Sequence, residues 1–531
     1  MFKTLKILAS ASALSLVAQF ATVGTASSEE VLRVVLASNV GALDPIATTS
    51  YATRTFAYMV YDVLISVDLD GVYRPQMLEK WDVSEDGALY TFTLRDQLTF
   101  NDGTPVTSKD VVASISRWWQ VDSFGKRLHD ATAELVAVDD NVFTLRLSRP
   151  FGHVIEALGK PSSNLPVIMP ARLAESTPPR EPVAEIIGSG PYTFDWATWN
   201  PGSTVTLVKR DDYVARDEPA SGFAGGKVPA MDRIEIINMP DPATQVSALQ
   251  QGEIDFIEMV PQDYIDLLTA DASVVMQSFT GANKTMGATV INHMNPPFND
   301  IKVRRALQAL GIHEEYMTGL GLKPDVWVHD CTSFFMCGSA YGSTAGNDML
   351  PEESVENAKK LLAESGYNGE LVRILHASTT NDINLMGLVL FGLMQQAGFN
   401  VELASSDWPT VANARWNKAT VEEGGWSLMQ VTWGGEDLGS PFTNYTIANN
   451  CSEGYAGWAC EPRITELVSA FEAETDIGKR QEITADIQRL AFENVQFLIQ
   501  GQYSRTQAYR ADIEGLQPQN SPVFWQVTRK K

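Results

Sequence analysis

The sequence predicts an α/β protein of several domains, and three observations carry that prediction. Strand-like and helix-like segments alternate through the second half of the chain, as they do in layered α/β domains. A separate segment with α+β character lies earlier, between about residues 73 and 182. The chain has 531 residues, and at about 150 residues per domain this length allows two to four domains.

The first part of the chain is predicted to contain isolated strands joined by loops. Residues 31–37 (VLRVVLA) form a short β-branched run bounded by polar residues, which is typical of a buried strand. Residues 39–54 are predicted to be a loop, and a Pro-rich polar stretch at 171–182 is a plausible border between domains. Further strand-like runs occur at 204–208 and 234–237.

Two alternating strands and one helix define the α+β segment. The first strand follows a turn at Asp86-Gly87, the second follows a turn at 139–141, and the helix is predicted at 108–119. In each strand, alternate residues are large and apolar, so one face is expected to pack inward. These inward residues are Tyr90, Phe92 and Leu94 in the first strand, and Phe143, Leu145 and Leu147 in the second.

Helices dominate the chain after Asp300, which is a candidate helix N-cap. A second helix has Ser354 as its candidate N-cap and Gly366 where a left-handed C-cap is expected. The predicted helices and the strands that alternate with them are helices 355–365, 463–471 and 479–494, and strands 371–375 and 399–403.

The N-terminus has the three parts of a secretory signal peptide. Lys3 and Lys6 give a positive start, a weakly apolar stretch follows from Ile7 to about Val23, and Gly24-Thr25-Ala26 offers small residues for cleavage. We expect cleavage after Ala26 and an exported, soluble mature chain. The alternative is a membrane anchor, although the stretch is Ala-rich and weak for a span of about 20 residues.

The charge balance excludes some partners. The chain carries 40 basic and 65 acidic residues, for a formal net charge of −25. Such a surface repels phosphate backbones and anionic lipid headgroups, so neither nucleic acid nor a membrane surface is expected as the partner.

The four cysteines predict disulfide bonds, because an even count is typical of exported chains. Four cysteines allow three connectivities. Proximity favours Cys331 with Cys337 and Cys451 with Cys460. A zinc site is the alternative, but neither spacing matches a CxxC half-site and no pair of histidines accompanies them. No metal and no cofactor are predicted.

No catalytic motif emerges from the sequence. Ser189 and Ser339 lack the G-x-S-x-G frame, there is no H-E-x-x-H and no phosphate-binding G-x-x-x-x-G-K-[ST] loop, and the six histidines are scattered singly. We therefore expect no enzyme activity. An exported hydrolase and an adhesion or structural surface protein are the alternatives of other classes.

Several segments, in order along the chain, resemble the dipeptide/oligopeptide/nickel-binding proteins, family 5 of the extracytoplasmic solute-binding proteins. The strongest match is residues 75–117 (PQMLEKWDVSEDGALYTFTLRDQLTFNDGTPVTSKDVVASISR). Residues 188–194 (GSGPYTF), 232–255 (including ALQQGEID) and 295–305 (NPPFNDIKVRR) follow in the expected order.

The resemblance implies a two-lobed periplasmic-binding-protein fold of the class II type. The first lobe would comprise residues 27–72, 183–290 and 500–531, with an extra α+β subdomain at 73–182. The second lobe would be residues 291–499. The chain would cross between the lobes near residues 289–295 and near Gln500.

The resemblance also implies a role in import. Such proteins capture a solute by closing their lobes around it and deliver it to a membrane permease powered by an ATPase. The chain would be a periplasmic, monomeric binding protein of an ABC importer with a small, peptide-like ligand. A non-peptide ligand of the same family (an opine, a sugar or a metal chelate) is the alternative.

In peptide-binding relatives, a carboxylate three residues after a Trp receives the ligand's amino group. Trp433 and Glu436 match these positions here, and Asp437 is adjacent. A buried ammonium requires an anionic acceptor, and Gly434-Gly435 would leave room for close approach. The alternative is a solvated acidic loop.

One departure from the family bears on the ligand. Dipeptide-binding relatives hold the ligand carboxylate with an Arg just after the strand that corresponds to 371–375, whereas this chain has HASTTND there. Arg54 could supply the charge from the other lobe, or it could form a surface salt bridge. Trp408 and Tyr51 are candidate aromatic walls of the cleft.

Overall fold

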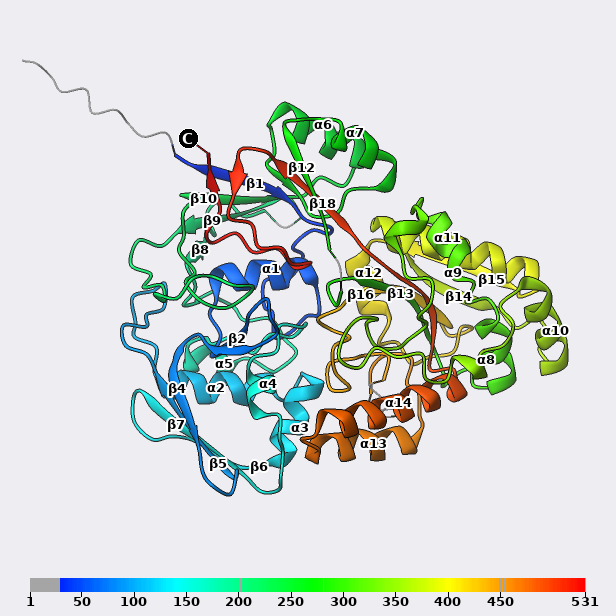
Figure 1. Ribbon diagram of the computed structural model, residues 1–531, viewed down its shortest axis with the longest axis horizontal. Helices are drawn as coiled ribbons and strands as arrows, with labels where there is room; N and C mark the ends of the chain where they lie inside the picture. The colour runs from blue at the N-terminus through cyan, green and yellow to red at the C-terminus, as the bar shows by residue number, and fades with distance from the viewer. Residues whose placement is uncertain (1–28, 201, 280, 448–450, 452–453, 531) are drawn as a thin grey trace, which may run out of the picture.

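The computed structural model describes residues 29–530 apart from residues 201, 280, 448–450, 452 and 453. The predicted signal peptide at 1–26 lies outside these residues. Two large β-sheets, each with its own helices, form two lobes that lie side by side (Figure 1). The predicted two-lobed α/β fold is therefore confirmed.

The first lobe is built on a seven-stranded mixed sheet. Its strand order is β12-β18-β11-β1-β10-β9-β8, with β1 parallel to both β10 and β11. The predicted strands at 31–37, 204–208 and 234–237 are all present in it. The strands are β1 Val31–Val35, β8 Tyr192–Phe194, β9 Thr204–Lys209, β10 Arg233–Ile237, β11 Phe256–Ile257, β12 Val274–Ser278 and β18 Thr506–Arg510.

A four-stranded antiparallel sheet lies within the segment predicted as the extra subdomain. Its order is β4-β5-β7-β6, and Phe92 and Phe143 stack across it with their ring centroids 4.8 Å apart. Sequence reasoning missed α3 and β6. The elements are β4 Leu78–Val83, β5 Leu89–Leu94, β6 Thr132–Ala137, β7 Val142–Leu147, α2 Ser108–Trp118, α3 Ser123–Ala131, α4 Val154–Leu158 and α5 Ala171–Ser176.

The second lobe is built on a five-stranded sheet of order β15-β14-β16-β13-β17. The predicted caps are present: Asp300 and Ser354 accept hydrogen bonds from backbone N–H groups of the first turns that follow them, and Gly366 is left-handed. The strands are β13 Thr285–Ile291, β14 Val372–Ala377, β15 Val401–Ser406, β16 Leu428–Gly434 and β17 Phe497–Tyr503. The helices are α8 Ile301–Gln308, α9 His313–Gly319, α10 Val355–Ser365, α11 Asn381–Ala397, α12 Trp408–Ala414, α13 Pro462–Ala473 and α14 Ile477–Asn494.

The chain crosses between the two sheets from β12 to β13 and from β17 to β18. The predicted crossings near 289–295 and near Gln500 are therefore displaced by a few residues. The apolar run of β13 is entirely buried between β16 and β17, so the chain has already entered the second lobe at Thr285. The two crossings run beside each other, because Ser278 pairs with Thr506 and Thr285 pairs with Tyr503.

The predicted loop at 39–54 ends earlier than expected, because helix α1 (Tyr51–Val60) begins at Tyr51. Ser50 is its N-cap and accepts a hydrogen bond from the backbone N–H of Thr53. A Ser at the N-cap position is a helix-start signal that the sequence contained. As a result, Tyr51 and Arg54 lie on a helix that is almost entirely buried.

The subdomain packs against the second lobe. Phe124 of α3 stacks on Phe442, with ring centroids 4.6 Å apart. Arg127 and Arg149 both form ion pairs with Glu472 of α13, at 2.6 and 2.8 Å. The structure is therefore a closed form, in which the subdomain contributes to the contact between the lobes.

The remaining elements are short and peripheral. No helix within the described residues is long and apolar enough to cross a membrane. These elements are β2 Ile65–Val67, β3 Tyr73–Pro75, β19 Ile513–Glu514, β20 Thr528–Arg529, α6 Pro242–Gln251, α7 Ile265–Thr269, and 3₁₀ turns at Gln262–Tyr264, Pro324–Val326 and Asn347–Met349.

The four cysteines are joined as Cys331–Cys337 and Cys451–Cys460, both in loops of the second lobe. We expect peptide mapping of natively exported protein, without reduction, to recover these two linked pairs. Each bond closes a short loop, so its stabilisation should be about 2–3 kcal/mol on the chain-entropy model. Free thiols or a crossed pairing in the exported protein would contradict this assignment.

Candidate functional site

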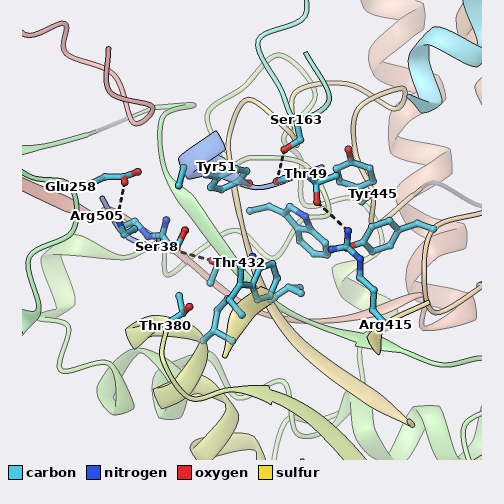
Figure 2. A pocket seen from close by; sticks show the side chains of 17 residues that line it. Ser38, Thr49, Tyr51, Ser163, Glu258, Thr380, Arg415, Thr432, Tyr445 and Arg505 are labelled. Carbon is cyan, nitrogen blue, oxygen red and sulfur yellow. Dashed lines mark hydrogen bonds between the residues drawn. The ribbon is translucent and has the colours of Figure 1, made fainter. Parts of the chain in front are cut away.

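A cavity of about 70 Å³ lies between the lobes and receives side chains from both. The first lobe contributes Ser38, Tyr51 and Glu258, and the second contributes Trp408 and Trp433. Figure 2 shows these walls from close by, with Glu258 and Arg505 on one side and Arg415 on the other. We call this space the inner chamber.

Aromatic side chains form much of the wall of the inner chamber. Trp433 stacks beside Tyr445, with centroids 6.5 Å apart, and Tyr445 packs on Tyr455 at 4.8 Å. Trp408 and Tyr51 also line the chamber. The structure thus brings three of the residues named from the sequence, Tyr51, Trp408 and Trp433, to one cavity. Flat, rigid rings of this kind suit apolar side chains and peptide planes.

The Tyr51 hydroxyl joins α1 of the first lobe to the loop that follows β16. It donates a hydrogen bond to the Asp437 carboxylate and accepts one from the backbone N–H of Gly434 at 2.9 Å. Burial, and secondarily the charge of Asp437, raise the pKa of Tyr51 well above its usual value. The phenol therefore stays protonated and keeps donating to Asp437.

Asp437 is fully buried and does not line the inner chamber, so it is not part of a solvated acidic loop. Besides the Tyr51 hydroxyl, it accepts a hydrogen bond from the backbone N–H of Ser163 at 3.0 Å. The Arg54 guanidinium lies 3.9 Å away and is itself 3% exposed. Arg54 is accordingly neither a surface salt bridge nor a cavity residue. It is the buried counter-charge of Asp437.

Glu436 also lies outside the lining of the inner chamber. Its Oε1 accepts a hydrogen bond from the Ser521 hydroxyl at 3.1 Å, and Ser521 in turn accepts one from Arg54. Close contacts within the chain, rather than contacts with a ligand, account for the two preceding glycines. A Cβ at Gly435 would lie 1.6 Å from the Ala282 carbonyl oxygen, and one at Gly434 would lie 2.7 Å from the Glu436 carboxylate.

Arg505 is a cavity residue that sequence reasoning missed. It lies in the second crossing, and its guanidinium forms an ion pair with Asp382 at 3.0 Å and donates to the Thr432 hydroxyl at 3.0 Å. Glu258 is nearby and accepts the Ala37 backbone N–H at 2.8 Å, while burial raises its pKa. One signal could have found Arg505, since it is the first cation after the predicted crossing at Gln500.

Arg415 is the second cavity residue that was missed, and no motif in the sequence distinguishes it. It follows α12 and is 6% exposed. Its guanidinium donates to the hydroxyls of Thr49 at 3.2 Å and Tyr455 at 3.5 Å. The indole N–H of Trp426 donates to its backbone carbonyl at 3.1 Å and fixes the main chain.

A larger cavity of about 440 Å³, the outer chamber, adjoins the inner one between the subdomain and the second lobe. The two share the lining residues Thr49, Trp408, Arg415, Tyr445 and Tyr455. Phe442 and residues of α3 and α13 close the far side. A space of this size is within the usual range for small-molecule sites. Among the described residues, no three His, Cys, Asp or Glu side chains are grouped as metal ligands.

Comparisons with known proteins assign the chain to one kind of protein. The family model for bacterial extracellular solute-binding proteins, family 5 (middle), matches residues 72–455. A probable peptide ABC transporter periplasmic-binding protein of Sinorhizobium fredii is 33% identical over 531 residues, which covers 98% of each chain. The glutathione-binding protein GsiB of Escherichia coli K12 is 28% identical over 283 residues, 52% of this chain and 50% of that protein.

Solved structures share the fold. The dipeptide-binding protein of Pseudoalteromonas sp. SM9913, in complex with Met-Leu, matches with a TM-score of 0.79 at 20% identity, covering 94% of this chain and 100% of that one. The protein AgaA of A. tumefaciens R10, in complex with agropinic acid, matches with a TM-score of 0.77 at 23% identity, covering 94% and 99%.

Proposed function

Because this chain belongs to family 5 of the bacterial extracellular solute-binding proteins, we propose that it captures a small, peptide-like solute between its lobes and delivers it to the permease of an ABC importer. The chain is the substrate-binding component of such an importer. The proposed role requires no catalytic step, since the ligand leaves chemically unchanged. We place the protein in the periplasm, after signal cleavage at Ala26.

The observation that carries this proposal is the inner chamber itself, which both lobes build. Its walls come from α1 and the β1 end in the first lobe and from β16 and α12 in the second. A ligand there contacts both half-sites only when the lobes are closed. Its greater affinity for the closed form is therefore what would drive closure. The permease would then recognise the closed, loaded form.

The similarity to the Sinorhizobium protein supports a peptide-like ligand, because that protein is named as a peptide transporter component and matches along almost its whole length. The aromatic walls of the inner chamber are consistent with this class. We propose that Tyr51, Trp408 and Trp433 contact the ligand. Arg54, Glu436 and Asp437 would act behind them, through the contact between the lobes.

Ligand should make the molecule more compact. Small molecules released from natively purified protein would be identified by mass spectrometry, and these together with defined di- and tripeptides would be titrated against stripped protein. We expect the radius of gyration in solution scattering to fall on binding. The melting temperature should rise with ligand concentration as RT ln(1 + [L]/Kd) requires.

The control is a solute that should change neither the radius of gyration nor the melting temperature, such as an amino-acid mixture at the same ionic strength. A ligand that saturates the protein without compaction would contradict closure. Turnover of any bound peptide would contradict a purely binding role.

A further inference from the structure

Glu258 places a carboxylate in the wall of the inner chamber. It follows β11 of the first lobe, is partly buried, and accepts the Ala37 backbone N–H through its Oε2 at 2.8 Å. No Lys, Arg or His of the described residues lies within ion-pair distance of this carboxylate. The internal residues outside the described part, at 201, 280, 448–450, 452 and 453, include no Lys, Arg or His. The second oxygen of Glu258 is thus available to a cation that enters the chamber.

The charges around Glu258 leave an excess of negative charge at this end of the chamber. Arg505 pairs with Asp382 at 3.0 Å, and Arg54 pairs with Asp437 at 3.9 Å. The Glu258 carboxylate interacts electrostatically with both of these guanidinium groups and with a further carboxylate. The group has four carboxylates and two guanidinium groups, which are Glu258, Glu436, Asp382, Asp437, Arg54 and Arg505. Carboxylates in a site that excludes water are costly unless cations balance them, so this end of the chamber favours a further positive charge.

The rest of the wall also suits a positively charged group. Trp408, Trp433 and Tyr445 line the chamber, together with the hydroxyl-bearing residues Ser38 and Thr380 (Figure 2). The faces of aromatic rings attract cations, most strongly where water is excluded. Hydroxyl oxygens can accept hydrogen bonds from the N–H groups of an ammonium ion. The volume of about 70 Å³ suits one compact group of a ligand rather than a whole molecule.

We infer that the ligand carries a positively charged amine, an ammonium or an alkylated ammonium group, and that this group binds in the inner chamber against Glu258. This inference rests on the proposed function and names the class of its substrate. It places the acceptor of the amine in the first lobe, because Glu258 lines the chamber whereas Glu436 does not. Arg415, another cation in the chamber wall, lies at the opposite end (Figure 2).

The binding test uses probes with and without the charged amine. Calorimetry would compare the tripeptide Ala-Ala-Phe with propionyl-Ala-Phe, which lacks only the ammonium group, and choline would test a free alkylated ammonium ion. We expect the wild type to bind at least one cationic probe and Glu258→Gln to lose about 30-fold or more in affinity for it. Glu185→Gln removes the same charge from an exposed carboxylate outside the chamber that pairs with Arg172, and it should bind as the wild type does.

The affinity of the wild type for a cationic probe should fall as the pH is lowered. Burial raises the pKa of Glu258 above its ordinary value, so this side chain takes up a proton at a higher pH than an exposed glutamate does. Binding is then strongest above the raised pKa and weakens below it, because the protonated carboxyl has no charge to offer. The two arginines nearby stay charged throughout. Glu258→Gln should remove this part of the pH dependence, which separates Glu258 from the other acids that face it, Glu436, Asp382 and Asp437.

A melting measurement without ligand separates binding from structure. The amide oxygen of Glu258→Gln can still accept the Ala37 backbone N–H, and the substitution removes a carboxylate that has no paired cation. The melting temperature of stripped protein should therefore be unchanged or higher. A lower melting temperature, together with an equal loss of affinity for charged and neutral probes, would make Glu258 a structural residue and overturn the inference.

Three other outcomes overturn the inference: equal binding of the tripeptide and its propionyl analogue, binding of neither cationic probe by the wild type, or a larger loss in Glu436→Gln than in Glu258→Gln. Compaction by a native ligand without a positively charged amine would also overturn it, yet would leave the transport role intact. A bound molecule that produces no compaction would contradict the transport role instead, so the two failures are distinguishable.

Discussion

Replacing Asp437 with Asn is expected to weaken ligand binding by about 30- to several-thousand-fold. Asp437 follows β16 in the second lobe, whereas its partners Tyr51, Arg54 and Ser163 belong to the other side of the interface. These contacts exist only when the lobes are closed. Removing one partner of a buried, hydrogen-bonded charge pair costs about 2–5 kcal/mol, and here that cost falls on the closed form alone. Apparent affinity falls in proportion to the closed population.

The measurement is calorimetric affinity for a ligand that compacts the wild type, together with solution scattering. Asp437→Asn should reach the wild-type radius of gyration once ligand saturates it. The unfolding temperature of stripped protein should change little, because water solvates residue 437 in the open form. Glu436→Gln is the matched neighbour. Its carboxylate accepts a hydrogen bond from Ser521, whereas the Asp437 carboxylate accepts two, from Tyr51 and Ser163, so we expect a smaller loss.

If Glu436→Gln instead causes the larger loss, and acetylating the ligand's amine abolishes binding, Glu436 contacts the ligand amine as the family resemblance implies. The closing role proposed for Asp437 would then be wrong.

Lys227→Met is expected to lower the free energy of unfolding by about 3–5 kcal/mol. The Lys227 ammonium and the Asp62 carboxylate are 2.7 Å apart, and both side chains are 0% exposed. Asp62 also accepts the Tyr213 hydroxyl at 3.1 Å, and Lys227 lies 5.0 Å from the ring centre of Trp525. The substitution leaves a carboxylate buried without its cation, which is far more costly than the loss of a surface pair.

Urea unfolding monitored by Trp fluorescence would give this number. Lys323→Met is the control, since Lys323 pairs with Asp266 at 2.8 Å, close to the 2.7 Å of the buried pair, but is exposed. Its loss should be barely measurable. A second variant, Lys227→Met with Asp62→Leu, removes both charges and should recover much of the stability. If Lys227→Met is as stable as Lys323→Met, the buried pair does not stabilise the lobe.

Strand alternation and helix caps predicted much of the fold, because each of these patterns involves residues only a few positions apart in the sequence. Alternation at Phe92 and Phe143 predicted the subdomain sheet, and the caps at Ser354 and Gly366 predicted α10 to its ends. Residues 39–54 were predicted to be a loop although Ser50 offered an N-cap signal, so the start of α1 was not predicted. The positions of the crossings depend on which strands pair with each other, and a local hydrophobic period does not contain that information.

The site was less predictable for the same reason. Trp433 could be named because it matches a family motif, and Trp408 because aromatic side chains suit the wall of a cleft. The partners of Asp437 could not, since Tyr51 is 386 residues away in the sequence. Nor does a single Arg show in the sequence whether it will pair with a buried carboxylate, as Arg54 does, or with hydroxyl groups, as Arg415 does.

The paired crossings between the lobes have a kinetic consequence. Both connections run together, flanked by the Ser278–Thr506 and Thr285–Tyr503 pairs, so the lobes can separate by rotating about this one place. A solute enclosed between them cannot leave until that rotation occurs. The opening rate therefore sets an upper limit on the dissociation rate of every ligand, whatever its chemistry. Ligands of quite different affinity would then differ in the fraction of opening events that end in dissociation. The permease could accelerate release simply by holding the lobes apart.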